Sequence, residues 1–222
     1  METGQHYHVF NHSNGFEDIF NEARNYHYFM MRLLFKTGSC VRLPAFCLMP
    51  NHFHLACGIP ELDKLRERDP SFGLLDEAAA CRQISQRLSN ALNSYTQSFN
   101  HTYGRMGSLF RQNTRWKMVE DEAGLCALIH YIHANPVHHG FVRRMEDWPY
   151  SSYSIYRSMS AAEARKNPII QLFGGMDGFI RYHEQEILLK IPDVSKERKL
   201  LGMEFKKVRA RRSNDSDSDQ HA

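Results

Sequence analysis

The stretch "VRLPAFCLMPNHFHLACGI" (41–59) decides the fold of this chain. Its two halves, 41–49 and 52–59, are apolar and rich in residues that favour β-strands, and only Pro50-Asn51 separates them. The pattern therefore predicts a β-hairpin. Because proline cannot donate a hydrogen bond to a neighbouring strand, Pro44 indicates an edge strand or a bulge in the first half.

Further elements surround the hairpin. Residue patterning predicts two more strands, at 6–12 and 114–120, and three helices, at 17–36, 75–104 and 121–135. The third helix is expected to stop near Asn135, because a proline at 136 disfavours a helical residue before it. Four strands interleaved with three helices predict an α+β domain with a mainly antiparallel sheet packed against helices.

Composition limits the classes of protein that fit. The chain has 222 residues, 42% of them hydrophobic, which is enough for one core or for one domain with an appended element. It contains no run of eighteen apolar residues and no basic-then-apolar leader, so we expect a cytoplasmic protein without a membrane span. Its five cysteines are scattered without a CxxC pair, which favours free thiols over disulfides or a zinc knuckle. The net charge of +3 is compatible with nucleic-acid binding but does not require it.

The hairpin carries a histidine pair, His52 and His54. Residues two apart on a strand share a face and lie about 7 Å apart, so both imidazoles could bind one divalent ion while Phe53 packs on the opposite face. An isolated H-x-H is also common in strands whose histidines are partly exposed and hydrogen-bond to their neighbours, so the pair needs partners before it indicates a metal site.

The segment "HYIHANP" (130–136) offers such partners. Tyr131 and Asn135 are four residues apart and therefore lie on one helical face. The amide oxygen of Asn135 could complete a three-ligand site, with Tyr131 beside the ion. A tyrosine hydroxyl, with a pKa near 10, is a weak nucleophile until its surroundings activate it. A tyrosine that anchors the core is the alternative role for Tyr131.

Three blocks in order, "LMPNHFHL" (48–55), "YIHANPV" (131–137) and "DWPYSSY" (147–153), resemble the single-tyrosine HUH transposases, most closely the REP-associated tyrosine transposases. "GSLFRQNTRWKMVED" (107–121) resembles the segment that precedes the family's tyrosine helix. The resemblance covers residues 5–160 and implies a ferredoxin-like, RRM-like nuclease domain. It also implies that His52 and His54 hold a metal, that Tyr131 is the nucleophile and that Asn135 matches the third ligand.

The resemblance implies an enzyme that cleaves and rejoins single-stranded DNA bearing hairpins, through a 5′-phosphotyrosine intermediate. The cofactor would be Mg²⁺ or Mn²⁺, and the residues do not choose between them. Two other functions stay open. One is a DNA- or RNA-binding regulator that keeps the fold without mobility, and the other is a metal-dependent DNA hydrolase in which Tyr131 is structural.

DNA binding requires positive charge and surfaces for stacking, and "YGRMGSLFRQNTRWK" (103–117) combines both. We expect its four cations to contact DNA: Arg105, Arg111, Arg115 and Lys117. A solvated loop and strand is the alternative. Whether the protein is a monomer or a homodimer is not determined by the sequence.

The chain is expected to divide into three parts. Residues 1–160 form the nuclease domain, and 161–195 form a C-terminal helical extension with two short helices broken at Gly174-Gly175. Residues 196–222 are first basic and then polar and low in complexity, which is typical of a disordered tail.

Overall fold

The structure is a computed structural model that describes residues 1–15 and 17–185. Its strands are β1 (His6–His12), β2 (Arg42–Met49), β3 (His52–Gly58) and β4 (Arg115–Val119). The longer helices are α1 (Ala23–Thr37), α3 (Glu77–Tyr103) and α4 (Glu122–His138). Shorter helical elements are α2 (Leu62–Arg68), η1 (Pro70–Phe72), η2 (Met145–Asp147), α5 (Ser152–Arg157), α6 (Ala161–Lys166), α7 (Pro168–Leu172) and α8 (Met176–Glu184).

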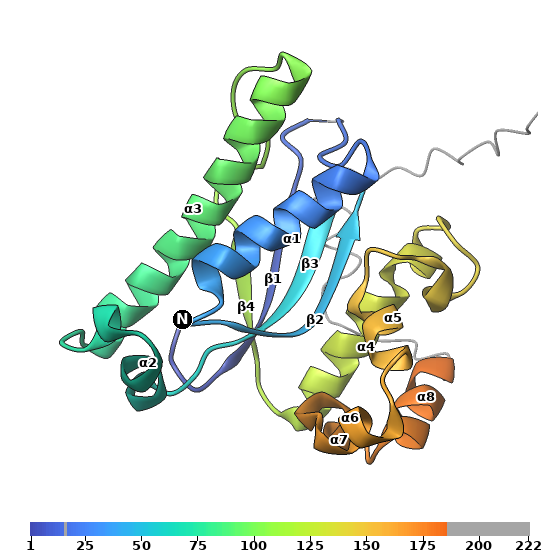
Figure 1. The fold of residues 1–222 in the computed structure, drawn as a ribbon. Helices are drawn as coiled ribbons and strands as arrows, with labels where there is room; N and C mark the ends of the chain where they lie inside the picture. The colour runs from blue at the N-terminus through green and yellow to red at the C-terminus, as the bar shows by residue number, and fades with distance from the viewer. Residues whose placement is uncertain (16, 186–222) are drawn as a thin grey trace, which may run out of the picture. The chain divides into compact units, whose positions relative to one another are not determined.

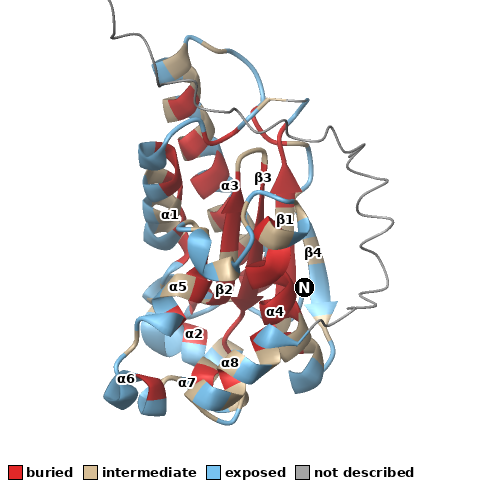
Figure 2. Ribbon diagram, turned by 90° about the vertical axis from the view of Figure 1, so that its right-hand side faces the viewer, coloured by how far each residue is buried: buried red, intermediate tan, exposed pale blue. Residues whose placement is uncertain are grey.

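The strands form one antiparallel sheet in the order β2-β3-β1-β4. Helices α1 and α3 cover one face of the sheet, and α4 lies on the other (Figure 1). This arrangement confirms the predicted α+β class and the predicted hairpin. Strand β3 lies inside the sheet and has helices on both faces, so all seven of its residues are buried (Figure 2).

Alternation along β3 separates the core from the opposite face. Phe53 is fully buried on the face that meets α1, where its ring lies 5.2 Å from that of Phe29. The same core continues into α3 through Tyr95, whose ring lies 5.2 Å from Phe29 and whose hydroxyl donates to the carbonyl of Ile19. Because side chains alternate along a strand, His52 and His54 must face α4.

The first helix starts later than its pattern predicts. Helix α1 begins at Ala23, not at residue 17. Apolar Ile19 and Phe20 mimic helical spacing, yet their backbone amides both donate to the carbonyl of Pro50, which anchors them at the β2–β3 turn. Glu22 then caps the helix through reciprocal bonds with Asn25.

The prediction that the third helix stops near Asn135 was wrong. Helix α4 runs on to His138 with Pro136 inside it. A proline removes one backbone donor, but so close to the end it breaks only one turn of bonding. The backbone amide of His139 still bonds to the carbonyl of Asn135 at 3.0 Å, and that of Phe141 bonds to the carbonyl of Pro136 at 2.9 Å. Burial of Asn135 and Pro136 against the sheet outweighs the local preference.

The short helices after α4 build a second, smaller core. Tyr153, Tyr156 and Phe179 pack there with Ala164 and Ile170. Helices α7 and α8 meet at Gly174 and Gly175, both with positive φ, which confirms the predicted break. The boundary expected at 160 stays a prediction, and the expected tail, 196–222, lies outside the described residues, as does the end of the extension.

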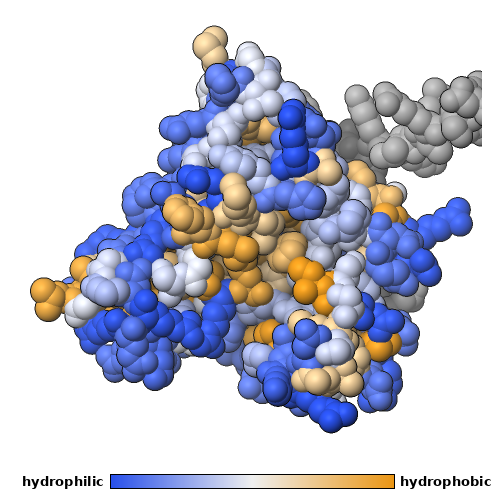
Figure 3. All heavy atoms as spheres, in the orientation of Figure 1, coloured by the Kyte–Doolittle hydropathy of each residue, from blue (hydrophilic) through white to orange (hydrophobic). Residues whose placement is uncertain are grey.

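Hydrophobic side chains gather over the C-terminal half of α1 (Figure 3), where Met31, Leu34 and Phe35 are all exposed. No helix among residues 1–15 and 17–185 is both long and apolar enough to cross a membrane. All five cysteines are free thiols, four of them buried, as the sequence predicts.

Candidate active site

The four residues expected to perform the chemistry lie together between β3 and α4. The rings of His52 and His54 are 5.0 Å apart. Oδ1 of Asn135 lies 3.5 Å from Nε2 of His52, and the ring of Tyr131 packs edge-on to that of His54 at 5.5 Å. Tyr131 and Asn135 are one helical turn apart on α4, so Tyr131 lies beside His54 and Asn135 lies beside His52.

The donor set fits a divalent ion. Two ligand atoms bound to one ion, each at 2.0–2.2 Å, lie about 3–3.5 Å apart, which matches the separation of His52 Nε2 and Asn135 Oδ1. Nδ1 of His52 is bonded to Oδ1 of Asn51 at 2.7 Å, and Nδ1 of His54 to Nε2 of His8 at 3.0 Å. In metal sites such bonds to the other ring nitrogen orient a ligating histidine and leave Nε2 for the ion.

The candidate ligands are two imidazoles and one amide, without a carboxylate or a thiol. Within residues 1–15 and 17–185, no group of three or more His, Cys, Asp or Glu side chains is arranged to hold a metal. The amide of Asn135 therefore matters to the candidate site, since two histidines alone would bind a divalent ion only weakly.

Burial controls the protonation of the site. His52 and His54 are each 2% exposed, and desolvation followed by neighbouring histidines lowers the pKa of both well below the usual histidine range. Both rings are therefore neutral at physiological pH, the form that binds metals. The expected alternative of partly exposed strand histidines does not describe this pair. Tyr131 and Asn135 are 6% and 1% exposed.

Strand β1 brings further histidines to the site, which sequence analysis missed. His12 pairs with His52 across the strands, and their rings stack at 5.5 Å with planes 3° apart. Nε2 of His12 is buried without a hydrogen-bond partner among the described residues. His139, just after α4, places its ring 5.1 Å from that of His52. The signal was present in "HYHVFNH" (6–12), whose alternation puts His8 and His12 on one strand face.

Two of the four expected DNA contacts are exposed on β4, and the other two, Arg111 and Arg105, are half-buried and bonded within the protein. Arg115 and Lys117 are exposed on β4 and pair in register with Phe10 and His8, so they lie on the same sheet face as the histidines. Arg111 is half-buried and donates to the carbonyl of Ser13.

Arg105 is held by bonds within the protein. It forms an ion pair with Glu17 and donates to the carbonyls of Gly107 and Ser108. These bonds fix the loop that follows α3.

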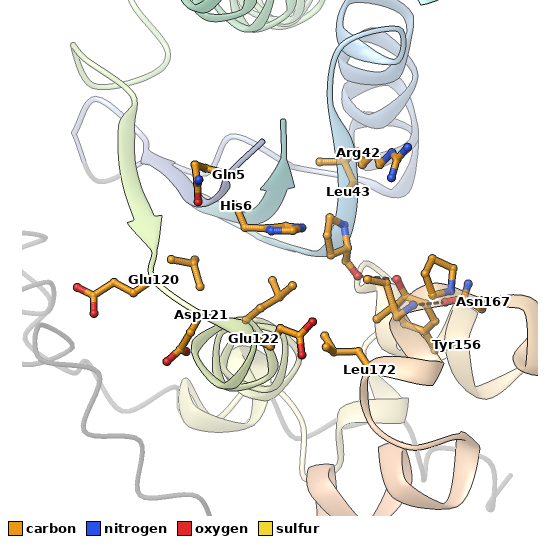
Figure 4. Close-up of a pocket in the computed structure, with 15 residues that line it drawn as sticks. Gln5, His6, Arg42, Leu43, Glu120, Asp121, Glu122, Tyr156, Asn167 and Leu172 are labelled. Carbon is orange, nitrogen blue, oxygen red and sulfur yellow. Dashed lines mark hydrogen bonds between the residues drawn. The ribbon is translucent and has the colours of Figure 1, made fainter. Parts of the chain in front are cut away.

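A pocket of about 590 Å³ opens elsewhere, at the start of α4 (Figure 4). Glu120, Asp121 and Glu122 line it together with Arg42 and Tyr156. Asn135 lies thirteen positions further along the helix than Glu122, a rise of about 20 Å. The pocket is therefore distinct from the histidine site.

Comparison with known proteins identifies a relative in sequence. A Haemophilus influenzae protein named "Putative REP-associated tyrosine transposase" is 27% identical over 115 residues, which are 49% of this chain. The match spans 57% of that relative, a little over half of its length. No model of a protein family matches the chain.

A solved structure of a REP-associated tyrosine transposase bound to a REP hairpin is 18% identical, with a TM-score of 0.49. The superposition covers 76% of this chain and 85% of the other. Together, the three sequence blocks and the 115-residue match make this chain similar to the REP-associated tyrosine transposases.

Proposed function

We propose that this chain cleaves and rejoins single-stranded, hairpin-bearing DNA by transesterification at Tyr131. The supporting observation is the pairing of α4 with β3. Asn135 reaches His52 and, one turn earlier, Tyr131 reaches His54. A nucleophile beside a candidate cation site is what attack on a phosphodiester requires.

The reaction conserves bonds. The hydroxyl oxygen of Tyr131 forms a bond to phosphorus as the bond from phosphorus to the 3′-oxygen breaks. The phenol loses its proton, and the released 3′-oxygen gains one. The products are a 5′-phosphotyrosine and a free 3′-hydroxyl. Because the phosphodiester energy is retained, another 3′-hydroxyl can reverse the step and join the strands without ATP.

His52, His54 and Asn135 would hold a divalent cation, Mg²⁺ or Mn²⁺. When bound, such a cation supplies positive charge that polarises a phosphodiester and stabilises the transition state. The protein's own residues position the groups. Asn51 and His8 fix the two imidazole rings, and the packing of Tyr131 against His54 keeps its ring beside the site.

The exposed cations of β4 support a DNA substrate. Arg115 and Lys117 line the site face, where a phosphate backbone that enters the site would pass. The transposase named in the sequence match supports strand transfer over simple cutting. Single-stranded, hairpin-bearing DNA as the substrate rests on the family resemblance of the three sequence blocks.

A covalent adduct tests the proposal. Wild-type protein, incubated with labelled single-stranded hairpin DNA and Mn²⁺, should yield a protein–DNA species that survives denaturing electrophoresis. Tyr131→Phe keeps the ring and should bind DNA and Mn²⁺ but form no adduct. Tyr103→Phe, outside α4, is the matched control and should react normally. Free cleavage products without an adduct would indicate a hydrolase, and DNA binding without cleavage would indicate a regulator.

A further inference from the structure

A second histidine cluster lies on the side of α4 that faces away from the sheet. His133 is fully buried, and its two ring nitrogens lie 2.9 Å from Nε2 of His183 on α8 and 2.8 Å from Oγ of Ser152 on α5. The cluster takes no part in the chemistry proposed above. Its position on α4 still links it to that chemistry, because His133 lies two residues from Tyr131 and two from Asn135 on the same helix.

Backbone groups at both ends fix the direction of these hydrogen bonds. Nδ1 of His183 lies 2.8 Å from the carbonyl of Phe179, which can only accept. A neutral His183 therefore accepts at Nε2, so Nδ1 of His133 donates and its Nε2 accepts from the hydroxyl of Ser152. The serine oxygen then accepts from the backbone amide of Phe46 at 2.9 Å. Every donor meets an acceptor when both histidines are neutral.

This hydrogen-bond chain connects four elements: β2, α5, α4 and α8. It ends on β2 at Phe46, next to Cys47, which pairs in register with His54 on β3. The bonds from α4 therefore reach the strand adjacent to the candidate ligands without passing through the site.

The geometry explains what such a connection would control. An α-helix turns by about 100° per residue, so His133 lies about 200° around the axis from both Tyr131 and Asn135. Bonds on that side resist rotation of α4, whereas apolar packing alone is non-directional and permits small rotations. A rotation would withdraw Asn135 from His52 and Tyr131 from His54 together.

We propose that His133 is a positioning residue, which sets the rotation of α4 through its bonds to Ser152 and His183 and so holds Tyr131 and Asn135 at the site. The inference rests on the proposed function. It gives the histidine of "YIHANPV" (131–137) a role that contact with DNA does not require.

Three variants separate positioning from general stability. His133→Phe keeps a ring of similar size and removes both bonds, whereas His133→Gln restores a donor and an acceptor. Tyr156→Phe is the matched control. It removes a buried hydroxyl that donates to the carbonyl of Pro44 at 2.5 Å, in the same core but without a bond to α4. Should His133→Phe fail to fold, Ser152→Ala breaks the same hydrogen-bond chain with a smaller change.

The measurements are Mn²⁺ affinity by electron paramagnetic resonance, DNA affinity, and the single-turnover rate of adduct formation. His133→Phe should weaken Mn²⁺ binding about tenfold and slow adduct formation about 10–100-fold, with DNA affinity within about twofold. His133→Gln should recover part of both losses, and Tyr156→Phe should match wild type in both.

Three results would overturn the inference. If His133→Phe keeps the wild-type Mn²⁺ affinity and rate of adduct formation, the cluster contributes packing only. The same conclusion follows if Tyr156→Phe loses as much affinity and rate as His133→Phe. If the wild-type chain neither binds Mn²⁺ nor forms an adduct, the proposed function and this inference fall together. If it binds Mn²⁺ without forming an adduct, the proposed function alone fails, and Mn²⁺ affinity decides the positioning role.

Discussion

Nε2 of His8 lies 3.0 Å from Nδ1 of His54, and the two rings stack with planes 24° apart. When Nε2 of His54 faces an ion, its Nδ1 carries the proton and donates to His8. Metal-binding proteins often use a carboxylate or a backbone carbonyl in this position, but here a second imidazole accepts the bond. Desolvation, followed by the nearby Lys117, lowers the pKa of His8 to about 3, so His8 remains an acceptor at physiological pH.

Removing this acceptor should weaken metal binding. His8→Phe keeps a ring in place, and we expect it to lower Mn²⁺ affinity about 10–100-fold, the usual effect of losing such a partner. His8→Gln retains an acceptor and should recover part of the loss. His6→Phe, on the same strand and face but nearer the pocket, serves as the control. Titration calorimetry with Mn²⁺ measures all three, and equal affinity in His8→Phe and wild type would refute the role.

Substitution of the site histidines should affect stability as well as cleavage. The sequence alone suggests that His52→Ala and His54→Ala leave the fold largely intact, because strand histidines that face a site contribute little packing. Both rings are in fact 2% exposed, so each substitution should also lower the free energy of unfolding by about 1–3 kcal/mol.

Cleavage should be lost in both variants at temperatures where they remain folded. Phe53→Leu, between the two histidines, is the control, since it disturbs the core on the opposite face and keeps the ligands. Urea denaturation measures stability, and gel assays at low Mn²⁺ concentration measure cleavage. A folded alanine variant with full cleavage would contradict the metal role.

Local patterning predicted the sheet well because alternation and turn residues are local properties. The strands at 6–12 and 114–120 and the hairpin at 41–59 follow from it, as does α3. Helix boundaries were less predictable. Tertiary bonds to Pro50 hold Ile19 and Phe20 outside α1, and no local signal reports such bonds.

The candidate site shows the same division between local and distant interactions. Sequence spacing alone placed His52 and His54 on one face of a strand, and Tyr131 and Asn135 on one face of a helix. Participation of His8 depends on pairing between β1 and β3, strands separated by α1 and β2 in the chain. Sequence spacing could not predict that pairing. Nor could it separate Arg105, which binds Glu17, from the exposed cations of β4.

The exposed β4 cations should carry DNA affinity. Arg115→Ala and Lys117→Ala should each weaken binding and lower the slope of log affinity against log salt concentration by about one unit. Arg82→Ala on α3, an exposed cation on the opposite side of the sheet, should leave the slope unchanged. Arg105→Ala should mainly reduce stability, because its ion pair with Glu17 is partly shielded from solvent. Fluorescence anisotropy at several salt concentrations measures the slopes, and identical slopes in all variants would refute the β4 surface.

Buried neutral histidines should make the fold sensitive to acid. Desolvation lowers the pKa of His130 and His183 to about 4 each, whereas an unfolded chain has histidines near 6.5. Between pH 6.5 and 4 the unfolded chain therefore binds more protons than the folded one, so stability is fully present above 6.5 and falls as the pH drops. Each such group contributes up to about 1.4 kcal/mol per pH unit.

Urea denaturation at pH 7, 6 and 5 measures this slope. His130→Phe removes one titrating group and should flatten the slope by about 1.4 kcal/mol per pH unit. His101→Gln, at an exposed position near the end of α3, is the matched control for the loss of a histidine. If the free energy of unfolding of the wild-type chain is the same at pH 7 and pH 5, the buried histidines do not titrate on unfolding as their burial requires. A slope that is unchanged in His130→Phe would assign the acid sensitivity to the other buried imidazoles, at β1, β3 and the His133 cluster.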